Sequence, residues 1–176
     1  VQDWSPDDKQ LLVLEEISIN EVYIWLFNTA TGEKKEVTPR SDQGAEKVAY
    51  SAACFAKDGK GIFVTTDRAS EFQRLAYIDL ASGKHTYLQG EAKFDVDDWD
   101  LSDDGKQIAY TLNENGESTL HLVDVAMKGG AMSAFASRDP VFNPPLKNVV
   151  MAGLGWHRHS DKNMVAFNVT GARMPF

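Results

Sequence analysis

The chain has 176 residues, of which 43% are hydrophobic and 25% are charged, a composition typical of an ordinary folded domain. Its net charge of -8 argues against a nucleic-acid partner, which would need a clustered cationic surface. No apolar run approaches the roughly 20 residues of a membrane-spanning helix, so we expect no membrane partner. The single cysteine, Cys54, excludes an intramolecular disulfide.

In chain order, the predicted elements follow one pattern of turns and short apolar strands that occurs four times. The first copy comprises a turn over 4–9, strands over 11–14 and 22–27, a turn over 29–33 and a strand over 35–38. The second comprises a strand over 48–53, a turn over 57–60 and strands over 61–66, 75–80 and 85–88. The third comprises a turn over 101–106 and strands over 108–112, 120–125 and 132–135. The fourth comprises a strand over 149–155, a turn over 157–162 and a strand over 164–169.

The lysines that close the first turn of each copy predict a repeat of ~40–50 residues, as in four-stranded propeller blades. They are Lys9, Lys60, Lys106 and Lys162. Helix signals are nearly absent, so we predict an all-β fold, a partial β-propeller made of four-stranded antiparallel blades. We expect blades 48–90 and 94–136 to be complete and blades 3–39 and 149–176 to be partial. Because a closed propeller needs ~4–8 blades, we expect a fragment of one propeller domain whose cut edges self-associate.

Particular residue types define the turns and the innermost strands. Asp-Gly in the first turn of two copies forms a two-residue hairpin turn, because these residues tolerate positive φ. Asn28, Asp79 and Asp124 are expected to end the third strand and to hydrogen-bond the turn that follows. The runs 48–53 and 149–155 are rich in small residues, which suits strands that crowd around a central channel.

Strand alternation places the second loop of each blade and the connections between blades on one face, where we expect any binding residues. These loops are predicted over 15–21, 40–47, 67–74, 113–118 and 137–148. Two charged groups there are candidates for loop-face contacts: Asp67, Arg68, Glu71 and Arg74 in one loop, and Glu15 and Glu16 in another. The first group is also interpreted as a salt-bridged brace between blades. The second is interpreted as a solvated pair or as a holder of a peptide's amino terminus.

Motifs that would carry chemistry within the chain are missing or incomplete. No G-x-S-x-G nucleophile elbow occurs. His157 and His159 resemble a metal pair, but no third ligand is identifiable, so a surface turn is favoured. The acidic run over 95–104 lacks the spacing of a calcium-binding EF-hand loop and is interpreted as a solvated strand end with a turn. The sequence therefore predicts no catalytic residue, cofactor or metal site within these residues.

The turns WSPDDK, KDGK and SDDGK resemble those in propellers of the prolyl oligopeptidase family of serine peptidases, and also those of TolB-like propellers. The segments TDRASEFQRLAY (66–77), FDVDDWDLS (94–102) and NVTGAR (168–173) are similar to a bacterial branch of that peptidase family, with dipeptidyl- and acylaminoacyl-peptidase-like members.

This resemblance implies a parent chain whose C-terminal α/β-hydrolase domain, outside residues 1–176, carries a Ser-Asp-His triad. The propeller would then restrict access so that only short peptides reach the triad, and these peptides and the hydrolase domain would be its partners. The resemblance slightly favours an exported protein. The alternative is a non-catalytic TolB-like scaffold that binds protein partners.

Overall fold

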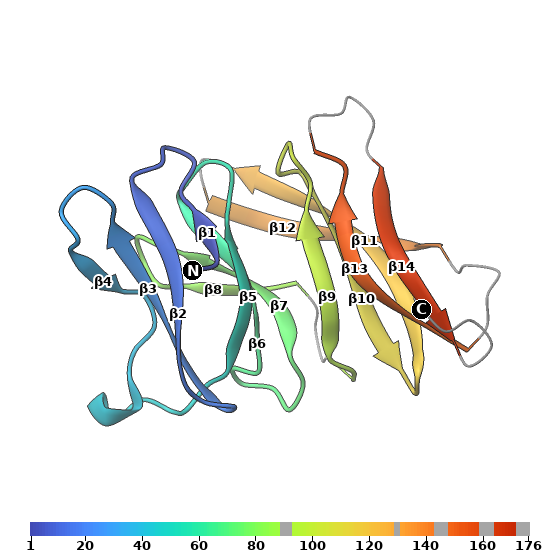
Figure 1. The fold of residues 1–176 in the computed structure, drawn as a ribbon, viewed down its shortest axis with the longest axis horizontal. Helices are drawn as coiled ribbons and strands as arrows, with labels where there is room; N and C mark the ends of the chain where they lie inside the picture. The colour runs from blue at the N-terminus through green and yellow to red at the C-terminus, as the bar shows by residue number, and fades with distance from the viewer. Residues whose placement is uncertain (89–92, 129–130, 143–147, 159–163, 172–176) are drawn as a thin grey trace. The chain divides into compact units, whose positions relative to one another are not determined.

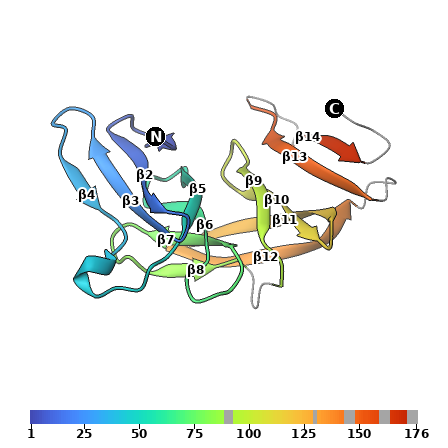
Figure 2. The same ribbon diagram turned by 60° about the horizontal axis from the view of Figure 1, so that its bottom comes forward.

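The structure is a computed structural model that describes residues 1–88, 93–128, 131–142, 148–158 and 164–171. These residues form strands arranged in four antiparallel sheets, together with one short 3-10 helix, η1 (Ser41–Gln43). The sheets belong to two compact units of two sheets each, which we describe separately (Figures 1 and 2). Within the described ranges, no helix is long and apolar enough to span a membrane.

The first unit contains two four-stranded sheets, each with its strands in chain order. One sheet consists of β1 (Asp3–Trp4), β2 (Gln10–Ser18), β3 (Glu21–Asn28) and β4 (Lys34–Glu36). The other consists of β5 (Tyr50–Phe55), β6 (Gly61–Thr66), β7 (Arg74–Asp79) and β8 (His85–Tyr87). Strand β5 packs against β1, β2 and β3 of the neighbouring sheet. Apolar side chains from both sheets fill the space between them, among them Leu12, Ile24, Phe55, Ile62 and Val64.

The second unit contains a four-stranded and a two-stranded sheet. The larger consists of β9 (Val96–Leu101), β10 (Gln107–Glu114), β11 (Glu117–Lys128) and β12 (Ala131–Phe142). The smaller consists of β13 (Val149–Trp156) and β14 (Val165–Gly171). Strand β13 packs against β9, β10 and β11, and the core includes Ala109, Leu120, Met151, Leu154 and Trp156. Four-stranded antiparallel sheets in chain order were predicted from the repeat, and this prediction is confirmed.

The first turns of the first and third copies share one hydrogen-bonding pattern. Backbone N–H groups of Gln10 and Gln107 each donate to the hydroxyl of the serine that opens the turn, Ser5 or Ser102, over 2.9 Å. Each serine hydroxyl in turn donates to the aspartate two positions after it, Ser5 to Asp7 over 2.8 Å and Ser102 to Asp104 over 2.7 Å. The residue after that aspartate has positive φ in both copies, and glycine occupies this position in one of them.

The third turns confirm two of the three predicted polar contacts. Asn28 accepts hydrogen bonds from the backbone N–H groups of Ala30 and Thr31, and Asp79 accepts one from Ser82. The prediction for Asp124 is wrong, because β11 continues to Lys128 and no turn follows Asp124. Its carboxylate instead accepts a hydrogen bond from the side-chain amide of Gln107 over 3.0 Å.

Three predicted loops are partly or wholly strand. Glu15 and Glu16 lie within β2, because the hairpin between β2 and β3 continues to its tip near Ile19. The predicted loop over 113–118 is a continuation of β10 and β11 around a two-residue turn, whose Asn115 and Gly116 both have positive φ. The predicted loop over 137–148 is strand β12 up to Phe142, and residues 143–147 lie outside the described ranges.

A β-bulge interrupts each of two strands, β5 and β13, which occupy the same place in the repeat. The register shifts between Ser51 and Ala53 in β5 and between Ala152 and Gly155 in β13. Ala52 and Gly153, which stand three residues before the aromatic residue that ends each strand, have φ angles of 39° and 66°. The repeat therefore preserves the place of the bulge as well as that of the turns.

Candidate functional site

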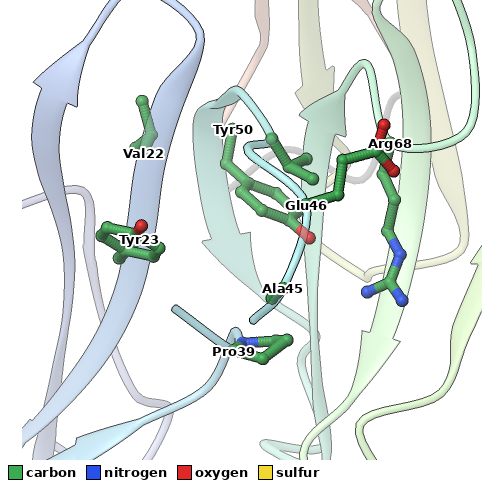
Figure 3. A pocket seen from close by; sticks show the side chains of 8 residues that line it. Val22, Tyr23, Pro39, Ala45, Glu46, Tyr50 and Arg68 are labelled. Carbon is green, nitrogen blue, oxygen red and sulfur yellow. The ribbon is translucent and has the colours of Figure 1, made fainter. Parts of the chain in front are cut away.

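A pocket of about 70 Å³ lies in the first unit, at the end of the sheets where the predicted binding loops occur (Figure 3). It is bounded by the start of β3, the start of β5, the connection over 37–49 and the loop over 67–73. Its lining combines apolar and charged side chains: Val22, Tyr23, Pro39, Ala45, Glu46, Val48, Tyr50 and Arg68. One candidate from the sequence, Arg68, therefore lines the pocket.

The connection between the two sheets is held by a buried carboxylate. Glu21, at the start of β3, accepts hydrogen bonds from the hydroxyls of Tyr23 and Ser41 over 2.5 and 2.7 Å and pairs with Lys47 over 2.8 Å. These bonds, with that from Lys47 the strongest, lower the pKa of Glu21 from 4.5 to about 2. The carboxylate thus remains ionised and anchors both ends of the connection that forms one wall of the pocket.

Glu15 binds side chains from two other segments of the first unit. Its carboxylate accepts hydrogen bonds from the indole N–H of Trp25 over 2.7 Å and from the guanidinium of Arg40 over 3.0 Å. Arg40 also lies over the ring of Tyr23, 4.5 Å from its centroid. Glu15 therefore braces the hairpin against the connection, whereas Glu16 is exposed beside it on β2.

The loop over 67–73 is held by hydrogen bonds at both ends. Asp67 accepts a hydrogen bond from the backbone N–H of Ala49 over 2.8 Å. Arg74 donates to the carbonyls of Arg68 and Ala69 over 3.1 and 3.3 Å, and its guanidinium stacks 3.8 Å from the ring centroid of Tyr87. Glu71 is exposed. Two of the four charged candidates in this loop thus fix its shape, and Arg68 is presented on a backbone that they hold.

Tyr50 and His85, which sequence reasoning missed, complete one side of the pocket region. The ring nitrogen Nδ1 of His85 lies 3.0 Å from the carbonyl of Gly83, so it carries the proton and Nε2 accepts the hydroxyl hydrogen of Tyr50 over 3.3 Å. Burial, followed by the charge of Arg68, lowers the pKa of His85 to about 4. Burial also raises the pKa of Tyr50, an effect that Arg68 opposes. No local signal links residues that are 35 positions apart.

The acidic run of the second unit joins its two sheets. Asp98 and Asp100 on β9 accept hydrogen bonds from the backbone N–H groups of Leu154 and Trp156 on β13, both over 2.8 Å. Asp100 also binds the guanidinium of Arg158 through both oxygens, over 2.8 and 2.9 Å. The interpretation of this run as a solvated strand end is therefore wrong for Asp98 and Asp100, whose oxygens bind a neighbouring strand.

No group of three or more potential metal ligands assembles among the described residues. His159, one member of the predicted histidine pair, lies outside the described ranges. The hydroxyl of Thr119 reaches Nε2 of His121 over 2.9 Å, but Glu114 faces the same nitrogen over 4.0 Å. A catalytic relay needs the nucleophile and the orienting carboxylate on different nitrogens of the histidine base, so this cluster is not one.

No protein-family model and no curated protein sequence matches the chain. A structure from a mechanistic analysis of two prolyl endopeptidases matches with a TM-score of 0.60 and 13% identity, over 97% of this chain and 26% of that one. Oligopeptidase B from Trypanosoma brucei matches with a TM-score of 0.58 and 15% identity, over 84% of this chain and 21% of that one. TolB from Acinetobacter baumannii matches with a TM-score of 0.54 and 19% identity, over 75% of this chain and 30% of that one.

This chain therefore spans less than a third of the length of each of these three structures. The low identities mean that the matches establish a common fold and leave activity open. Taken with the repeated four-stranded antiparallel sheets, they identify the fold of this chain as a segment of a β-propeller, as its sequence predicts.

Proposed function

We propose that this chain is a propeller segment of a serine peptidase of the prolyl oligopeptidase family. It restricts access of short peptides to a catalytic α/β-hydrolase domain that lies outside residues 1–176. The observation that carries the proposal is the extent of the structural likeness. The match to the prolyl endopeptidase structure covers 97% of this chain, whereas the match to TolB from Acinetobacter baumannii covers 75%.

Two segments that resemble the peptidase family, 66–77 and 94–102, provide further support because their residues hold a loop and join two sheets. Residues 66–77 comprise the end of β6, the pocket-side loop and most of β7, and residues 94–102 include all of β9. In these segments, Asp67 and Arg74 hold the loop, while Asp98 and Asp100 join two sheets. The residues that resemble the peptidase family are thus those that shape the loops and the sheet packing of this propeller.

The contribution of the chain is binding and exclusion rather than bond cleavage. Among the described residues, His85 pairs with Tyr50 and Gly83, and His121 lies beside Thr119 and stacks on Tyr110. Neither imidazole is hydrogen-bonded to a serine hydroxyl in the manner that activates a nucleophile.

The complete gene product tests this proposal. We expect a serine-directed fluorophosphonate probe to label it at a position outside residues 1–176. We also expect it to cleave a short peptide but not the same sequence placed in a surface loop of a folded carrier protein. Absence of labelling, or labelling within residues 1–176, would contradict the assignment to a serine peptidase. Equal cleavage of peptide and carrier would contradict the restriction of access.

The second candidate is a non-catalytic scaffold of the TolB type, which the TolB matches favour. It predicts a gene product that closes its propeller, lacks a hydrolase domain and remains unlabelled by the probe. Labelling of the gene product therefore separates the two candidates in one measurement.

A further inference from the structure

We propose that the pocket beside Arg68 binds the C-terminal carboxylate of a short peptide, with the last side chain of that peptide against the apolar lining. The proposal rests on the proposed function for the choice of a peptide as ligand. The pocket itself, its charge and its rigidity are features of the first unit alone.

Arg68 has charge available for a ligand, unlike its basic neighbours. Arg40 pairs with Glu15 and Asp42, and Lys47 pairs with Glu21. Among the described residues, no carboxylate lies within ion-pair distance of the half-buried Arg68 side chain. A guanidinium is always protonated and presents five donors in a planar fork that matches a carboxylate.

The backbone of Arg68 is held in place by hydrogen bonds of the protein itself. Its backbone N–H donates to the hydroxyl of Thr66 over 3.1 Å, and its carbonyl accepts from Arg74 over 3.1 Å. Asp67, the preceding residue, is tied to the backbone of Ala49. A backbone held in this way needs no reordering when a ligand binds, so the cost of binding is confined to the side-chain torsions of Arg68.

The remaining lining suits a small peptide terminus. Val22, Pro39, Ala45 and Val48 supply apolar surface, while Tyr50 contributes its ring (Figure 3). The volume of about 70 Å³ is several times the ~10–15 Å³ that one water molecule needs, so a carboxylate and a small side chain can enter. The hydrogen bond from Tyr50 to neutral His85 holds the tyrosine wall in place.

Glu46 allows the direction of an effect on binding to be tested, because its exposed carboxylate lines the same pocket. A negative charge near a bound carboxylate opposes binding, so removal of that charge must strengthen binding. Removal of the Arg68 charge must weaken it. The two substitutions Arg68→Gln and Glu46→Gln therefore form a matched pair with opposite expected effects.

The experiment measures binding of acetyl-Ala-Ala with a free carboxylate, acetyl-Ala-Ala amide and acetate to the complete gene product by calorimetry. A serine-directed inhibitor is present so that no peptide is turned over. We expect the free acid to bind about tenfold tighter than the amide, as loss of a charge-assisted hydrogen bond implies. Arg68→Gln should abolish this preference, Arg68→Lys should reduce it, and Glu46→Gln should increase it.

Equal binding of acid and amide, or a preference that survives Arg68→Gln, would overturn the proposal. Acetate binding as tightly as the peptide acid would also overturn it, because the pocket would then accept any small anion. Thermal unfolding of each variant verifies that the pocket is folded. If the gene product cleaves peptides but binds the peptide acid and the amide equally, only this inference is contradicted. If it prefers the peptide acid but is not labelled by the serine-directed probe, only the assignment to a peptidase is contradicted.

Discussion

The carboxylate of Asp100 accepts a hydrogen bond from the backbone N–H of Trp156 over 2.8 Å, across the boundary between the two sheets of the second unit. The first unit contains the equivalent bond, from the backbone N–H of Phe55 to Asp3, also over 2.8 Å. Both aspartates stand two residues before the serine that opens the first turn. A carboxylate at this place in the repeat therefore fastens the innermost strand of the next blade.

Asp100→Ala should lower the free energy of unfolding by about 2 kcal/mol, because it removes an acceptor from a buried backbone N–H and from Arg158. Asp3→Ala should have a smaller effect, since within the described ranges Asp3 makes one bond to the other sheet, from the backbone N–H of Phe55. Denaturant unfolding monitored by tryptophan fluorescence measures both changes. The exposed Glu16→Ala is the control and should change stability by less than about 0.5 kcal/mol. An Asp100→Ala variant as stable as this control would show that the bond contributes nothing.

Glu21 should make the protein sensitive to acid. Its pKa in the folded chain is about 2, below its ordinary value of 4.5, so the ionised form is the one that folding favours. The resulting stabilisation is present above pH 4.5 and is lost as the pH falls from there toward 2. Glu21→Gln should therefore flatten the pH dependence of unfolding in this window while lowering stability at neutral pH. An unchanged pH profile would contradict the assignment.

His85 should titrate far below an ordinary histidine. Its pKa of about 4 means that it stays neutral in the folded chain, so its contribution to stability is present above pH 6.5 and decreases as the pH falls toward 4. Tyr50→Phe removes the hydroxyl that donates to Nε2 of the neutral ring, so it should raise the pKa of His85. The NMR chemical shift of the ring proton between the two nitrogens, followed against pH, reports both values. A midpoint near 6.5 in the unsubstituted protein would refute this prediction.

Gly61→Ala should destabilise the second sheet of the first unit by about 1–3 kcal/mol. A methyl group at Gly61 would overlap the ring of Tyr77, whose side chain is fully buried. The loss should shrink in a Tyr77→Leu background, where the clashing ring is gone. At Gly155, which also lies in a strand, the nearest atom is 4.0 Å away, so Gly155→Ala serves as the control. Thermal melts compare the four variants.

Turn chemistry and strand positions could be predicted from the sequence because they depend on neighbouring residues. Asn28 and Asp79 form their turns as expected, since each bonds to backbone within three residues. The hairpin tip at Asn115 and Gly116 also had a local signal, the Asn-Gly pair, which was interpreted as part of a longer loop.

The sheet-joining and pocket contacts could not be predicted, because they connect residues far apart in the chain. Asp100 and Trp156 are separated by 56 positions, and Tyr50 and His85 by 35. A run of aspartates has the same appearance whether water or a neighbouring strand satisfies its oxygens. Within the candidate site, the sequence identified Arg68 as a loop-face residue, while the apolar lining and its tyrosines emerge only when two sheets pack.

The bulge in β5 makes the middle of a buried strand tolerant of a change in chain length. Ser51 lies opposite Thr65 and Ala53 lies opposite Val64, which is the next residue along β6, so Ala52 is the one residue between them without a partner position. Deleting Ala52 would leave both pairings and the side of the sheet that each residue faces as they are. Deleting Val64 instead would turn one end of β6 over and expose its apolar side chains. Natural or engineered one-residue deletions in this sheet should therefore be found at Ala52.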